Sequence, residues 1–170
     1  TELASEGQIS AVNEAVKLQK LVQIACGVAY GDDGRNIALD CNNRVKLVED
    51  IINEVGGKVI VFVPLTGTLH MLEKRLEKTW TVGVVNAHPG TMAHGLTLTA
   101  ASTIIWYGPI TSNEQYVQAN GRIERIGKKH VSNIVHIEST KLEWKMYERL
   151  RNKQKLQGLL LDLIQEEGRR

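Results

Sequence analysis

The stretch Gln118-Ala-Asn-Gly-Arg-Ile-Glu-Arg-Ile-Gly127 organises this chain. Read as a helix, it brings Gln118, Arg122 and Arg125 to within about a quarter turn of one face. Gly121 lies beside them and carries no side chain that would hold a partner surface away. Two guanidinium groups on one helix face suit planar, bidentate recognition of phosphate or carboxylate. The stretch therefore predicts a helix that ends in an anion-recognising face.

Residues on either side of this stretch predict the bounds of the helix. Ser112-Asn-Glu-Gln115 fits a capping box, with serine at the N-cap and glutamine at N3. Gly127 stands where a left-handed C-cap would end the helix. We therefore expect a helix of about four turns that begins at Ser112. From these residues alone an alternative stays open, because helices rich in arginine and glutamate are often only solvated faces stabilised by i,i+4 pairs.

Three blocks of the sequence carry a family resemblance. The pattern Gln-x-x-Gly-Arg-x-x-Arg-Ile-Gly at 118–127 resembles motif VI of superfamily 2 helicases and translocases, in the form found in Swi/Snf-type ATPases. Upstream, the block Ala87-His-Pro-Gly-Thr-Met-Ala-His-Gly-Leu-Thr-Leu-Thr-Ala100 resembles motif V, and Lys58-Val-Ile-Val-Phe-Val63 resembles motif IV. The resemblance covers about residues 8 to 165. Motifs in the family's order weigh against the solvated-face alternative.

Strands that alternate with helices predict the fold class. The run 58–63 is fully apolar, as is typical of a strand buried in a parallel sheet, and the alternation implies right-handed βαβ crossovers. We expect an α/β fold, which the resemblance makes a RecA-like parallel sheet flanked by helices, preceded by an N-terminal helix and a small β-hairpin. The expected elements are a helix over 8–26 that stops at Gly27, a hairpin around Gly31–Gly34, a helix from Asn42 or Asn43, a strand over 58–63, a helix over 69–76, strands over 81–86, 103–107 and 131–137, and a helix over 140–166.

The length of 170 residues favours one domain. The resemblance implies that 1–170 is the helicase C-terminal lobe, with a leading helix plus hairpin in 1–42 and a C-terminal helix in 140–170. Between the helix over 69–76 and motif V, similar proteins have a strand, a loop, a helix and a second strand. This chain offers only about eight residues there. Either the protein is shortened here or a segment is missing after about Asn86, and we favour the second interpretation because losing a core strand would leave a hole in the sheet.

Composition excludes several classes of protein. Hydrophobic residues at 42% and charged residues at 24% are typical of a globular protein, and no apolar run reaches the roughly 18 residues of a membrane span. Because the net charge is only +2, affinity for nucleic acid would depend on local patches. Cys26 and Cys41 are not in a metal-ligand spacing, and two cysteines make no disulfide framework. We expect a soluble intracellular protein, cytoplasmic or nuclear, without metal or disulfide.

Half of an ATPase active site is missing from the sequence. ATP hydrolysis needs a phosphate cradle and a magnesium-binding carboxylate. The nearest approach to a phosphate loop, Gly121 to Lys129, has five residues between its glycines and no Ser or Thr after the lysine, and no Asp-Glu box follows an apolar strand. The chain therefore resembles only the second RecA-like lobe. ATP and Mg²⁺ would be held mainly by a first lobe absent from this chain, which alone should be inactive.

The resemblance also assigns roles to residues. Arg122 and Arg125 resemble arginine fingers that reach ATP across the cleft between lobes, and Gln118 resembles the glutamine that orients catalytic groups. Gly95 and Gly121 would let the backbone approach nucleotide closely. A non-catalytic nucleic-acid or protein interaction module that retains this fold is the alternative, although such a module would have no need for arginine fingers.

The expected nucleic-acid partner is DNA, contacted through its backbone because a translocase must step over any sequence. Thr66 and Thr68 follow the motif IV strand, where similar proteins contact the tracking strand, and His88 and Thr91 could donate to a phosphate from motif V. The cations of the last helix are better explained as a solvated face than as a basic patch. We expect Trp80, Trp106, Trp144 and Tyr107 to be core residues and not base-stacking platforms.

Overall fold

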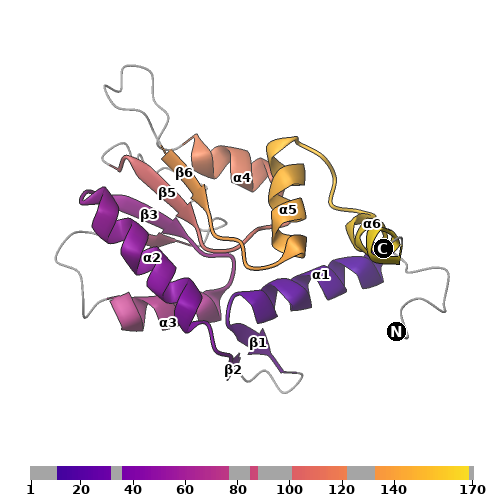
Figure 1. Cartoon of the computed structure of the whole chain (residues 1–170), viewed down its shortest axis with the longest axis horizontal. Helices are drawn as coiled ribbons and strands as arrows, with labels where there is room; N and C mark the ends of the chain where they lie inside the picture. Colours follow the sequence, from indigo (N-terminus) through magenta and orange to yellow (C-terminus); the bar gives the residue numbers. More distant parts are fainter. Residues whose placement is uncertain (1–10, 32–35, 77–84, 88–100, 122–132, 169–170) are drawn as a thin grey trace.

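A four-stranded parallel sheet forms the centre of the molecule (Figure 1). The computed structural model describes residues 11–31, 36–76, 85–87, 101–121 and 133–168. The strand order is β4 (Val85–Ala87), β3 (Val59–Phe62), β5 (Thr103–Trp106) and β6 (Asn133–His136), and each neighbouring pair is parallel. The two central strands are buried along their whole length, since helices cover both faces.

The two faces of the sheet have separate cores, because side chains alternate along each strand. On one face, alternate side chains of β3 pack with α2 (Asn42–Val55), α3 (Thr66–Leu76) and the inner side of α1 (Ala11–Ala25). On the other face, Ile60 and Phe62 pack with α4 (Asn113–Asn120) and with the inner side of α5 (Lys141–Arg151). Figure 1 shows α2 and α3 together, away from α4. The predicted α/β sandwich is confirmed.

The predicted hairpin follows α1 directly. Strands β1 (Val28–Tyr30) and β2 (Asn36–Ala38) pair antiparallel, with Ala29 opposite Ile37. Gly27 ends α1 as predicted, with φ of +81°. A Cβ at this position would lie 2.5 Å from the Sγ atom of Cys41, so both the backbone conformation and the space require glycine.

The single C-terminal helix predicted over 140–166 is wrong. The structure has two helices there, α5 and α6 (Leu159–Gly168), separated by a connection with left-handed residues at Lys153 and Gly158. Arg149 holds this connection, because its Nη1 atom donates to the backbone carbonyls of Lys155 and Gln157, both at 2.9 Å. The apolar spacing continues through the break, which is why the sequence pattern did not reveal it.

Helix α6 is fastened to α1 through the carboxylate of Glu14. One carboxylate oxygen accepts from the backbone N–H of Gly158 at 2.8 Å, and the other accepts from Leu160 at 3.0 Å. These donors belong to the first turn of α6, where N–H groups have no partner within the helix. Glu14 is 4% exposed, so it acts as a buried cap supplied from the opposite end of the chain.

The strand before motif V is observed in part. We predicted a strand over 81–86, and the described strand β4 runs from Val85 to Ala87, with Asn86 paired to Val61 and Ala87 to Phe62. Asn86 and Ala87 therefore lie in one strand. Residues 77–84 and 88–100 lie outside the described part of the chain, so the interpretation of a missing segment stays a prediction.

Candidate nucleotide and nucleic-acid site

Loops from β3 and β5 meet at the carboxyl edge of the sheet, where ligands of open α/β folds bind. The backbone N–H of Tyr107 donates to the carbonyl of Phe62 at 2.9 Å, so the two strands stay paired up to their ends. Beyond this pair, a Cβ on Gly108 would lie 2.4 Å from the Sγ atom of Cys26 and 3.2 Å from Pro64. Glycine at this position therefore lets the two loops and the end of α1 pack together.

The loop after β3 separates the two threonines that were predicted to contact nucleic acid. Thr66 is exposed at the first position of α3. Thr68 is 0% exposed, and its hydroxyl donates to the carbonyl of Cys26 at 3.4 Å. Between them, the N–H of Gly67 donates to the Tyr30 hydroxyl at 2.9 Å. The structure thus leaves Thr66 accessible to a nucleic-acid backbone. The hydroxyl of Thr68 instead connects α3 to the end of α1.

Helix α4 begins as predicted and presents Gln118 outward. The Ser112 side chain accepts from the N–H of Gln115 at 3.3 Å, which is the N-cap half of the predicted capping box. Gln118 is exposed, and its Nε2 atom donates to Oε1 of Glu114, one turn earlier, at 3.0 Å. Its side-chain amide therefore lies at the surface, bonded to Glu114.

Helix α4 ends at Asn120, so it is shorter than the predicted four turns, and the next residue, Gly121, keeps a helical backbone. Its φ is −63°, and its N–H donates to the carbonyl of Val117 at 3.0 Å. A Cβ at this position would meet its nearest neighbour, that same carbonyl, at 3.4 Å, so neither strain nor crowding inside the chain requires glycine here. A role in close approach to something outside the described residues stays a prediction.

The other predicted site residues lie outside the part of the chain that the structure describes. They are Arg122 and Arg125 after α4, and Gly95, His88 and Thr91 in the motif V block. Their roles stay predictions. Helix α4, which contains the start of the motif VI segment, packs on the sheet. The same sheet contains β4, the strand that leads into motif V.

Polar side chains behind α4 form a group that sequence analysis missed. The indole Nε1 atom of Trp106 donates to Oδ1 of Asn120 at 2.9 Å, and the Tyr116 hydroxyl lies 2.8 Å from Nε2 of His136. Burial lowers the pKa of His136 to about 4, and the positive charge of Arg151 acts in the same direction. The imidazole is therefore neutral at pH 7. The only hint in the sequence was a donor-bearing indole at the end of a buried strand.

Two of the aromatic predictions are confirmed and one is wrong. Trp106 and Tyr107 are fully buried, as expected of core residues. Trp144 is 44% exposed because it lies on the outer side of α5, whereas Met146 and Tyr147 face the sheet. Trp80 lies outside the described residues.

Three cations of α5 face acidic side chains of α6. Lys145 and Arg149 form ion pairs with Glu166 and Asp162 of α6, and Lys141 lies 3.5 Å from the same Glu166 carboxylate. Charges that are already paired add little attraction for a polyanion. For these three residues the pairing favours the predicted solvated face over a basic patch.

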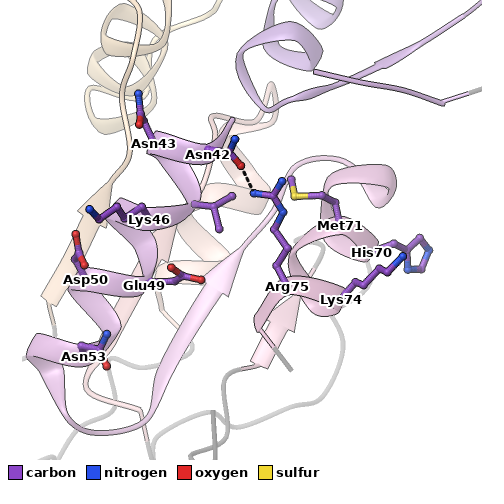
Figure 2. Close-up of a pocket in the computed structure, with 11 residues that line it drawn as sticks. Asn42, Asn43, Lys46, Glu49, Asp50, Asn53, His70, Met71, Lys74 and Arg75 are labelled. Carbon is purple, nitrogen blue, oxygen red and sulfur yellow. Dashed lines mark hydrogen bonds between the residues drawn. The ribbon is translucent and has the colours of Figure 1, made fainter. Parts of the chain in front are cut away.

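Two of the grooves on the described surface bear on ligand binding. The larger, of about 1040 Å³, runs between α2 and α3 (Figure 2). It mixes Lys46 and Lys74 with Glu49, and Arg75 donates to Oδ1 of Asn42 at 2.7 Å, so it presents no single charge to a ligand. The smaller, of about 350 Å³, lies at the carboxyl edge between α1 and the start of α4. Apolar side chains dominate its lining, so neither groove offers a phosphate cradle.

Comparison with known proteins places this geometry among known folds. No protein-family model matches the chain. Protein p41 of Acyrthosiphon pisum secondary endosymbiont phage 1 is 30% identical over 185 residues, and the match covers 94% of this chain. The chain spans only 40% of the length of p41. Because the match is longer than the 170 residues of this chain, p41 has residues within it that this chain lacks.

Solved structures identify the fold. The C-terminal part of the Fun30 ATPase domain matches 61% of this chain and 42% of that structure, with a TM-score of 0.52 and 20% sequence identity. The fold is that of a RecA-like lobe. A structure of the E. coli DEAD-box protein SrmB bound to the regulator of ribonuclease activity A matches 57% of this chain and 72% of the matched chain, with a TM-score of 0.46 and 18% identity. Among the helices of the described ranges, none is long and apolar enough to cross a membrane.

Proposed function

We propose that this chain is the second motor lobe of a Swi/Snf-type, ATP-dependent DNA translocase or helicase. The observation that carries the proposal is the placement of α4 in a RecA-like lobe. The helix is capped at Ser112, packs on one face of the sheet, and turns Gln118 outward. The sequence continues at once with Gly121-Arg-Ile-Glu-Arg125, which is where the second lobe of such a motor carries its arginines.

The proposed chemistry divides ATP hydrolysis between two lobes. A first lobe would hold ATP and Mg²⁺, which neutralises charge on the phosphates, because the sequence of this chain contains no phosphate loop. This chain would contribute Arg122 and Arg125, whose guanidiniums stabilise charge on the transferring phosphoryl group. Gln118 would orient catalytic groups from α4, which ends at Asn120. An arginine finger typically contributes about 10³-fold or more in rate.

The size of the phage relative supports a divided site. The match covers 40% of p41, so that protein is long enough to contain another lobe of similar size outside the match. The extra residues of p41 within the match also accord with the short interval before motif V, although their position there stays a prediction.

The proposed DNA contact runs through the sugar–phosphate backbone. Thr66 is the described candidate that is exposed at the carboxyl edge, whereas the N–H of Gly67 next to it already donates to the Tyr30 hydroxyl. His88 and Thr91 would add contacts from motif V. With Lys141, Lys145 and Arg149 of α5 paired within the chain, the proposed contact is local and modest in charge.

An ATPase assay on the full-length protein that contains this chain tests the proposal. We expect ATP hydrolysis that rises on addition of double-stranded DNA and changes little with its sequence. A full-length protein that binds DNA but hydrolyses no ATP, with or without DNA, would contradict the motor and would instead identify an interaction module with a retained helicase-lobe fold.

A further inference from the structure

Helix α4 has too few buried apolar side chains to set its own rotation about its axis. Among its eight residues only Tyr116 and Ala119 are buried. A helix on a sheet is normally oriented by an apolar stripe several residues long. The hydrogen bonds of its inner side are those of Tyr116 and Asn120, which lie four positions apart and thus share one face, and that of Asn113, whose Nδ2 atom donates to the Leu150 carbonyl of α5 at 2.7 Å.

Two hydrogen bonds connect this face of α4 to the ends of two strands. The indole of Trp106 can only donate, and it occupies Oδ1 of Asn120 at 2.9 Å. The Tyr116 hydroxyl lies 2.8 Å from Nε2 of His136.

Both partners of α4 in these hydrogen bonds, Trp106 and His136, lie at the ends of strands of the sheet. Trp106 ends β5, is 0% exposed, and has its ring centroid 4.9 Å from that of Phe62. His136 ends β6, with its ring 4.4 Å from that of Tyr147. The hydrogen bonds of Tyr116 and Asn120 therefore end on two neighbouring strands, which prevents rotation of α4 about its axis in either direction.

Gln118 lies midway between the two anchored residues, two positions after Tyr116 and two before Asn120. At 3.6 residues per turn, an offset of two places it roughly on the opposite side of the helix. We propose that Trp106 and His136 are positioning residues that hold the rotation of α4, so that Gln118 faces away from the sheet. The consequence of this orientation for catalysis rests on the proposed function, whereas the anchoring of α4 itself does not.

Spin labels on the full-length protein measure the anchoring directly. One label is attached to Val117→Cys on the outer side of α4 and the other to Glu54→Cys on α2, both at exposed positions. The native Cys26 and Cys41 are buried, so the labels go to the new thiols. In Tyr116→Phe and in Asn120→Ala, we expect the distance distribution to broaden about twofold.

Tyr147→Phe is the matched control. It also removes one buried hydroxyl on the same sheet face, which donates to the Trp106 carbonyl at 3.2 Å, and it keeps every hydrogen bond of α4. Its label distances should equal those of the unmutated sequence. Equal broadening in all three variants, or no broadening in Tyr116→Phe and Asn120→Ala, would overturn the anchoring.

Kinetics then test the effect on catalysis. We expect Tyr116→Phe and Asn120→Ala to lower kcat about 10-fold with KM for ATP within about twofold of its starting value, because misplacement of a transition-state group affects turnover more than binding. Tyr147→Phe should keep kcat. Broadened label distances with unchanged kcat would overturn the positioning role of Trp106 and His136. Absence of ATPase activity in the unmutated protein would overturn the proposed function, and the label distances would still decide the anchoring.

Discussion

Arg44 and Glu143, 99 positions apart in the sequence, form an ion pair with 2.5 Å between Nη2 and Oε1. Their side chains are only 4% and 0% exposed. Arg44 also donates to the carbonyl of Tyr107 and to Oγ of Ser139, the second at 2.7 Å, while the other oxygen of Glu143 accepts from the N–H of Thr140 at 3.1 Å. The pair thus ties the first turns of α2 and α5 to the carboxyl end of β5.

Glu143→Gln should lower the free energy of unfolding by about 3 to 5 kcal/mol, because it leaves the buried charge of Arg44 without its counter-ion. Urea unfolding followed by circular dichroism gives this value. Glu166→Gln is the control, since that carboxylate pairs with two lysines in solvent, and it should keep the unfolding midpoint. Equal stabilities of the two variants would show that the buried pair is dispensable.

Glu14→Gln should destabilise the protein by about 1 to 3 kcal/mol, because one of the two N–H groups at the start of α6 then faces the amide NH₂ instead of an acceptor. Hydrogen exchange at the Gly158 or the Leu160 amide should accelerate together with the loss of melting temperature. Glu54→Gln, at an exposed position of α2, serves as the control. Unchanged exchange rates at both amides would contradict the cap.

His136 should make the protein acid-sensitive in a defined range. Its pKa in the folded state is lowered to about 4, mainly by burial, against about 6.5 when unfolded. Between these values the unfolded state binds the extra proton, so stability is complete above about pH 6.5 and falls as the pH drops to about 4. Compared with His136→Gln, the unmutated protein should lose about 1 to 2 kcal/mol more over this range, a value reduced for the partial exposure of the ring. Parallel curves of unfolding free energy against pH for the unmutated protein and His136→Gln would refute this prediction.

The isolated chain of 170 residues should neither bind ATP tightly nor hydrolyse it, because its sequence contains no phosphate loop. Isothermal titration calorimetry with Mg²⁺ and ATP provides the measurement. Micromolar affinity would contradict the divided site, since the lobe would then hold nucleotide by itself.

In the full-length protein, Arg122→Ala or Arg125→Ala should reduce DNA-stimulated turnover about 10³-fold, or about 4 kcal/mol of transition-state stabilisation. Lysine should rescue poorly because it lacks the planar fork of arginine. Arg75→Ala, which removes an exposed arginine on α3, should keep turnover. Melting temperature and nucleotide-free DNA binding should hold in all variants. Weakened DNA binding with full turnover would make Arg122 and Arg125 nucleic-acid contacts.

Local chemistry made much of this fold predictable. The apolar run of β3 predicted a buried parallel strand, Gly27 predicted the end of α1, and Ser112 predicted the start of α4, since each depends on neighbours a few residues away. The prediction of one C-terminal helix failed because its break depends on bonds from Arg149 to carbonyls beyond the helix. Thr68 resembled a surface threonine until the fold placed it against Cys26.

The sequence by itself determined the order of the elements, the parallel sheet and the helix that carries Gln118, because hydrophobic period and capping residues act over one or two turns. Only the tertiary structure decided which polar groups are paired inside the protein. Arg44 finds Glu143, Glu14 finds the start of α6, and Trp106 finds Asn120 across separations that no local period encodes. Burial makes an unpaired polar group costly, so packing of the whole chain selects these partners.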